Sequence, residues 1–222
     1  LPEAVNEALS GSVAWDGKVG IDLPYHAGAT YNIELNGDLK NVSSHLPSPL
    51  AKPAGEPLAV NVKVDGNLNS FELTGQAGAD NHFNSRWLLG QKLTLDRAIW
   101  AADSKTLPPL PEQSGVELNM PPMNGAEWLA LFQKGAAERV GGAASFPQHI
   151  TLRTPMLSLG NQQWNNLSIV SQPTANGTQV EAQGREINAT LAMRNNAPWL
   201  ANIKYLYYNP SVAKTRGDST PS

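Results

Sequence analysis

Alternation of apolar and polar residues with a period of two runs through most of this 222-residue chain. In one segment Tyr31, Ile33 and Leu35 share a phase, while Asn32 and Glu34 take the other. Successive side chains of a β-strand point to opposite faces of a sheet, so this pattern predicts strands with one apolar and one polar face. Such one-sided strands are typical of antiparallel sheets. We therefore expect a mainly β, antiparallel fold.

The apolar phase selects a set of side chains that either fill a core or line a ligand-binding groove. We expect some members of the set to pack beneath a helix or against loops. The set consists of Ile33, Leu35, Val60, Val62, Val64, Phe71, Leu73, Phe83, Trp87, Leu89, Leu93, Leu95 and Ile99.

Glycine and proline divide the chain into strands and loops. Asp16-Gly17 and Asn176-Gly177 are typical of tight turns between strands. Alternation continues through Gly37 and Gly66, which lie at equivalent positions of a weak repeat between residues 33–40 and 62–69. Glycine inside a strand predicts a bulge or bend there. Residues 43–57 and 106–111 are too rich in proline for central strands and are expected to be loops.

One segment departs from the period of two and predicts a helix over residues 124–139. Asn124 is a favourable N-cap, and Glu127 three residues later resembles a capping box. Its apolar face would carry Trp128, Leu131 and Phe132. We expect this face to cover an open end or side of the sheet, with docking to a partner or a membrane surface as the alternative.

Composition excludes several functions. The net charge of −3 lacks the basic excess that nucleic-acid binding requires. There is no Cys, the four His have no metal-ligand spacing and are expected in loops or on the surface, and no nucleophile or phosphate-binding motif occurs. We therefore expect a protein that is not an enzyme and that carries no metal or cofactor. No apolar run is long enough for a membrane-spanning helix.

The ends of the chain suggest a section of a longer protein. It starts at Leu1 rather than Met, and it ends in a polar tail. We expect residues 1–210 to form the β section and residues 211–222 to be a disordered linker.

Alternation alone leaves two architectures open. A closed β-sandwich, acting as a scaffold or binding module, would fill its core with the apolar phase. An open groove would leave that phase accessible to an apolar ligand. The pattern by itself favours the closed core. An enzyme with residues assembled from separate loops would instead need a polar cleft with clustered His or carboxylate groups.

Five longer strings carry a specific resemblance that covers residues 13–210. They are SSHLPSPLAKPAG (43–55), NHFNSRWLL (81–89), LTLDRAIW (93–100), GAEWLALF (125–132) and YLYYNP (205–210). Through them the chain resembles the AsmA-like envelope proteins of enteric bacteria. That resemblance reverses the preference for a closed core.

The resemblance implies a fold and a function. Members of this family have a curled, repeating β-groove, or β-taco, with an apolar interior, and are similar to bridge-like lipid transfer proteins. The resemblance implies that the chain is an internal section of a periplasmic conduit that transfers phospholipids between inner and outer membranes and supports the outer-membrane barrier. The implied partners are phospholipid, the other segments of the same protein and other envelope proteins. It also implies that the longer protein is anchored in the inner membrane.

Overall fold

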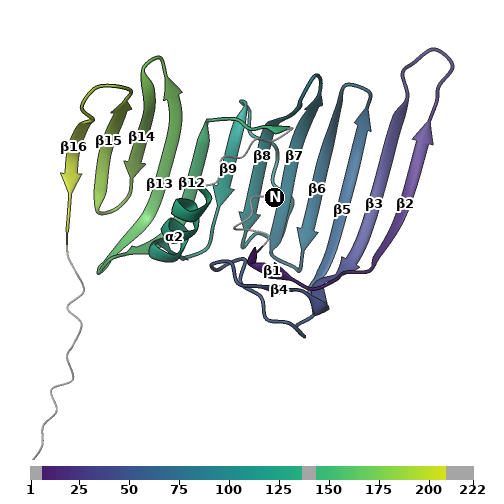
Figure 1. Ribbon diagram of the computed structural model, residues 1–222, viewed down its shortest axis with the longest axis horizontal. Coiled ribbons are helices and arrows are strands. Elements are labelled where there is room, and N and C mark those ends of the chain that lie inside the picture. The colour runs from purple at the N-terminus through teal and green to yellow at the C-terminus, as the bar shows by residue number, and fades with distance from the viewer. Residues whose placement is uncertain (1–6, 137–143, 209–222) are drawn as a thin grey trace, which may run out of the picture.

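The computed structural model describes residues 7–136 and 144–208, and in these residues the chain forms one large open sheet (Figure 1). This sheet has 14 strands, and β1 (Leu9–Ser10) and β4 (Ser43–Ser44) form a separate two-stranded sheet. The order across the main path is β16 (Leu200–Leu206), β15 (Ile187–Arg194), β14 (Gly177–Gln183), β13 (Gln162–Thr174), β12 (Ile150–Leu159), β9 (Gly115–Asn119), β8 (Leu93–Ala102), β7 (Asn81–Leu89), β6 (Ser70–Ala77), β5 (Ala59–Asn67), β3 (Thr30–Asp38) and β2 (Trp15–Asp22).

The two wings of the sheet are antiparallel, as the alternation predicts. β2 through β8 pair antiparallel, and so do β12 through β16. The centre differs from the prediction, because β8, β9 and β12 are parallel neighbours. Parallel neighbours need crossover connections rather than hairpins. The proline-rich residues 103–114 and the helical segment provide these crossovers, so the two segments that break the alternation join the wings.

The helix α2 (Gly125–Ala136) confirms the helix start that the sequence predicts. Asn124 Oδ1 accepts hydrogen bonds from the N–H of Ala126 at 3.1 Å and of Glu127 at 3.4 Å. The amide of Asn124 also donates to Glu127 Oε1 at 3.0 Å, which completes a capping arrangement. Residues 137–139 of the expected helix lie outside the described residues, as does the expected tail at 211–222.

Glycines have different roles from those that the sequence suggested, with one exception. Asn176-Gly177 does form the tight connection between β13 and β14. Gly17 instead lies inside β2, opposite Leu35 of β3, so the predicted hairpin turn there is wrong. Alternation of Trp15, Val19 and Ile21 simply continues through it.

The register of β3 with β5 is regular at Gly37 and Gly66, so of the predicted bulge or bend the bulge is wrong. Both leave space for an aromatic ring. A Cβ at Gly37 would lie 2.9 Å from Cε3 of Trp15, and one at Gly66 would lie 2.7 Å from the hydroxyl of Tyr31. The glycines of the weak repeat therefore leave room for the rings of Trp15 and Tyr31, which a side chain at either position would displace.

Glu186 clamps the turn between β14 and β15 to β13. Its two carboxylate oxygens accept hydrogen bonds from the backbone N–H and the side-chain amide of Asn165, each at 2.7 Å. Desolvation raises the pKa of Glu186, but these hydrogen bonds and the charge of Arg185 outweigh it, so the pKa lies below its usual value.

We predict that Glu186→Gln lowers the free energy of unfolding by about 1 kcal/mol at neutral pH, because one charge-assisted hydrogen bond is lost. A depressed carboxyl pKa contributes stability above the pKa of the unfolded state, and this contribution disappears as the pH falls through the folded-state pKa. Urea unfolding of the wild-type protein and the variant between pH 7 and pH 3 should therefore show a difference in the free energy of unfolding that decreases toward pH 3. A difference that is constant with pH would contradict the assignment.

Candidate functional site

One face of the main sheet carries almost the whole set of apolar residues that the alternation selects. Cross-strand partners in a sheet point to the same side. Ile33 pairs with Val64, and Leu35 pairs with Val62. Val64 pairs in turn with Leu73. The other members on this face are Val60, Phe71, Phe83, Trp87, Leu89, Leu93 and Leu95. We call this side of the sheet the apolar face.

Ile99 is the exception and corrects the sequence prediction. The pairing of β7 with β8 shifts between Arg86 and Trp87: Arg86 lies opposite Arg97, whereas Trp87 lies opposite Leu95. Asp96 is thus an extra residue, which is the definition of a β-bulge. The bulge reverses the phase, so Ala98 and Trp100 continue the apolar face, and Ile99 lies on the opposite face across from Asn84. The alternation of residues 93–99 does not predict this shift.

On that opposite face Ile99 is covered by residues 103–114, which we call the strap. The strap is held by polar residues of β7 and β8. His82 Nδ1 lies 2.7 Å from the carbonyl oxygen of Ser104, and the Asn84 amide donates to the carbonyl of Pro108 at 3.0 Å. Arg97 donates to the carbonyl of Pro111 at 3.3 Å. His82 is therefore a buried strand residue, and the expectation of a loop or surface position is wrong for it.

We predict that Ile99→Ala lowers the free energy of unfolding by about 2 kcal/mol or more, because it leaves a cavity under the strap. Its side chain is only 4% exposed. Since Ile99 does not lie on the apolar face, the substitution should leave binding of apolar ligands to that face unchanged. Thermal unfolding and a binding titration on the same sample separate the two effects, and loss of binding by a stably folded Ile99→Ala protein would contradict this placement.

The apolar face is only partly covered. Of the predicted residues on it, only Leu95 is buried, at 8% exposure, and Leu89 is 40% exposed. The remainder are half-buried. A second sheet packed across this face would bury them, and the described strands, apart from the short β1–β4 pair, all belong to one sheet. The described part of the chain is therefore an open sheet rather than a filled sandwich.

The cover that does exist lies at one end of the strands. Residues 39–58, which we call the cover, fold over the apolar face beside the first residues of β5 and β7 and the last residues of β6 and β8 (Figure 1). Between the cover and the sheet is a cavity of about 740 Å³. Leu46, Pro49 and Leu50 line it from the cover, and Val60, Val62, Gly75, Ala77, Phe83 and Trp100 line it from the sheet.

The helix α2 extends this cover across the centre of the sheet. Trp128 packs with Leu118, Leu152 and Leu157 around a core of Ala102, Met120 and Met123. The Trp128 indole N–H donates to the carbonyl of Ser48 at 2.9 Å, which links the helix to the cover. Leu131 is half-buried, and the side chain of Phe132 lies outside the described part of the structure. The expectation that the helix covers a side of the sheet is therefore confirmed.

Metal-ligating side chains and membrane-spanning helices were both considered for the described residues. Within residues 7–136 and 144–208, no three His, Asp or Glu side chains are close enough together to hold a metal ion. The same residues contain no helix with the length and hydropathy needed to cross a bilayer.

These features define a class of protein: a mainly β chain whose open sheet presents an extended apolar surface under partial cover. The family model described as YhdP protein matches residues 1–222, and the chain belongs to this family. It is 99% identical over all of its 222 residues to "Intermembrane phospholipid transporter YhdP" of Escherichia coli (strain K12), and it spans 18% of the length of that protein. No solved structure matches the chain.

Proposed function

We propose that the apolar face holds the acyl chains of phospholipids, and that this chain is one section of a path along which phospholipids pass between two membranes. The observation that carries the proposal is the row of half-exposed apolar side chains that continues from strand to strand on one face of an open sheet. Its close relative is named as an intermembrane phospholipid transporter.

Acyl chains suit this surface physically. Burying a methylene group of an acyl chain against an apolar surface stabilises the bound state by about 0.8 kcal/mol and requires no hydrogen-bonding partner. A half-exposed apolar row offers such burial at many equivalent positions, so a chain can shift along it without breaking directional bonds. Holding and moving a lipid in this way needs no acid, base or metal, so the proposed role is not enzymatic.

The proposal extends to the setting of the chain. The edge strands β2 and β16 expose apolar side chains, with Val19 67% exposed and Ile203 54% exposed. We propose that other segments of the longer protein continue the sheet at these edges, and that the longer protein is anchored in the inner membrane. The section itself would then lie in the periplasm, where it could also meet other envelope proteins.

Binding of a phospholipid with an environment-sensitive fluorophore on one acyl chain tests the proposal. The delipidated chain should bind this probe saturably, and unlabelled phospholipid should compete. Glycerophosphocholine, which has the head group and no acyl chains, should not compete. Competition by glycerophosphocholine as strong as that by the intact lipid would contradict binding through the apolar face.

A further inference from the structure

A row of apolar residues crosses the whole sheet on the apolar face, from the edge strand β2 to the edge strand β16. Each member is the register partner of the next, so the row follows the sheet from strand to strand. On β2 through β8 its members are Gly17, Leu35, Val62, Gly75, Phe83 and Trp100. On β9 and β12 through β16 they are Leu118, Leu152, Ile169, Ala182, Ala189 and Ile203. The apolar face therefore extends into a wing that contains none of the residues predicted to line a groove.

The wing beyond the centre presents the same kind of surface as the wing before it. Val180 pairs with Leu191, and each lies two residues from a member of the row, so both face the same side. Val180, Leu191 and Ile169 are half-buried, and Ile203 is exposed. Half-buried apolar side chains on an open sheet are the feature that carries the proposed function, so this wing qualifies as a second surface for acyl chains.

The centre of the row, by contrast, is filled. Trp100, Leu118 and Leu152 pack, together with Trp128 of α2, around the core of buried residues described above. Trp100 also lines the cavity under the cover, and among the described residues the lining of that cavity includes none from β9 or from β12 through β16. The cavity therefore ends at side chains that pack with α2.

The strand β8 is covered on its apolar side along most of its length. Leu95, Ala98 and Ala102 lie on that side, and each is at most 8% exposed. β11 (Ala144–Ser145) pairs with the start of β8, at the end of the strand away from the cover. On β6, by comparison, Leu73 of the apolar face is half-buried. The open surfaces of the two wings are thus separated from each other at β8.

The helix α2 is attached to the rest of the chain at two places. At its start, β10 (Met123–Asn124) pairs with β12, and Gly125 packs so closely that a Cβ there would lie 2.9 Å from the carbonyl oxygen of Ser158. Trp128 donates its indole N–H to the carbonyl of Ser48 in the cover. The start is thus fixed by backbone pairing, whereas the attachment to the cover depends on a side chain. A short helix held in this way can open locally while the sheet stays folded.

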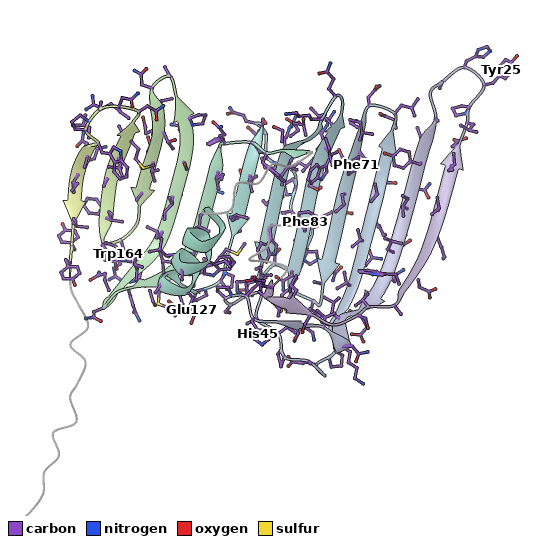
Figure 2. The ribbon with its side chains drawn as sticks, viewed as in Figure 1. Tyr25, His45, Phe71, Phe83, Glu127 and Trp164 are labelled. Atoms are coloured by element: carbon purple, nitrogen blue, oxygen red, sulfur yellow. The ribbon has the colours of Figure 1, made fainter. Side chains whose placement is uncertain are left out.

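From this arrangement we infer that α2 is a gate between two lipid compartments, one on the wing before β8 and one on β13 through β16. Figure 2 shows Glu127 of α2 between Phe83 of the first wing and Trp164 of the second. A phospholipid passes when α2 pivots about its start and the hydrogen bond between Trp128 and Ser48 breaks, because the row that α2 then uncovers is apolar throughout. With α2 in place, the packed core leaves no space for an acyl chain. The inference rests on the proposed function and adds a second binding surface and the control of passage.

Locking α2 to the cover in the full-length protein tests the gate. Ser48 and Leu129, the residue after Trp128, are both exposed, and this chain contains no Cys. Ser48→Cys and Leu129→Cys are combined, any Cys elsewhere is replaced by Ser, and the pair is joined with a bismaleimide that contains a cleavable disulfide. Transfer of pulse-labelled phospholipid from the inner to the outer membrane should fall about tenfold, because a gating motion is blocked, and should recover after reduction. The same variant treated with a monofunctional maleimide is the control and should transport normally.

Photocrosslinking separates this inference from the proposed function. A photoreactive amino acid at Val62 or at Ala182 reports labelled lipid in each compartment. Both positions should give adducts in the unlocked protein, and one of them should lose most of its yield when α2 is locked. Transport by the locked protein equal to that of the control, or unchanged yields at both positions, would overturn the gate and leave lipid binding intact. Adducts at Val62 with none at Ala182 in the unlocked protein would overturn the second compartment, and absence of adducts at both would overturn the proposed function and the gate with it.

Methionine oxidation tests the hydrogen bond from Trp128 separately. Met120 and Met123 are buried in the core that packs with Trp128. Trp128→Phe keeps an aromatic ring and removes the indole N–H, so hydrogen peroxide should oxidise both methionines about fivefold faster, as the loss of one hydrogen bond predicts. Trp199→Phe changes an exposed indole and should leave the rates as they are. Equal rates in the two variants would overturn the role of this hydrogen bond.

Discussion

Replacing Val62 by glutamate should reduce phospholipid transport by the full-length protein at least tenfold. Val62 lies near the middle of the apolar face, opposite Leu35 and Gly75, and lines the cavity under the cover. An acyl chain that passes over this position would have to desolvate a carboxylate, which costs several kcal/mol. The variant should fold, because Val62 is only partly buried and the added group can reach solvent through the open cavity when no lipid is bound.

The matched control places the same carboxylate on the neighbouring strand but on the opposite face. Thr74 pairs with Lys63 of β5, so Thr74→Glu adds a favourable cross-strand pair and leaves the apolar face intact. Transfer of pulse-labelled phospholipid from the inner to the outer membrane measures both variants. Equal transport by Val62→Glu and Thr74→Glu at equal protein levels would contradict the assignment of the path to the apolar face.

Filling the cavity with an apolar ring should also block transport, by occlusion rather than by charge. Gly75 lines the cavity, and a Cβ there would make ordinary contacts, the nearest being Phe83 Cδ1 at 3.5 Å. Gly75→Phe therefore extends a ring into the 740 Å³ space without a backbone clash. We expect transport to fall severalfold and the unfolding temperature to hold or rise, because the ring adds buried apolar area.

The corresponding control is Thr74→Phe, which adds the same ring to the opposite face. The measurement is the same pulse-label transfer, combined with thermal unfolding of the purified variants. Unimpaired transport by a folded Gly75→Phe protein would show that the space under the cover is not part of the lipid path.

Much of the fold follows from the sequence because a single physical rule, the alternation of side chains across a strand, applies to nearly every segment. That rule placed Ile33, Val62 and Leu73 on a common face, which the register confirms. Capping chemistry placed the start of α2 with equal success, since Asn124 and Glu127 make the expected contacts.

The failures arise where tertiary contacts override the local pattern. The bulge at Asp96 is stabilised by contacts from outside β8: Ser114 Oγ donates to the Asp96 carbonyl at 2.9 Å. A residue of the strap thus fixes a phase change that residues 93–99 do not reveal, and Ile99 was misplaced as a result. The parallel pairing of β8, β9 and β12 depends likewise on where the strap and α2 cross the sheet, which spacing along the chain does not determine.

The alternation could not decide between an open groove and a filled sandwich, because both architectures place the apolar residues of each strand on one face. The structure separates them through the half-exposed state of Val60, Val64 and Leu73.

The central claim is that lipid travels on one face of this sheet, and face-resolved photocrosslinking tests it most directly. A photoreactive amino acid is placed in the full-length protein at Val62 or Leu73 on the apolar face, and at Lys63 or Glu72 on the polar phase of the same two strands. We predict phospholipid adducts, identified by mass spectrometry, at Val62 and Leu73 and background levels at Lys63 and Glu72. Adducts at the polar-phase positions with none at Val62 and Leu73 would contradict the account.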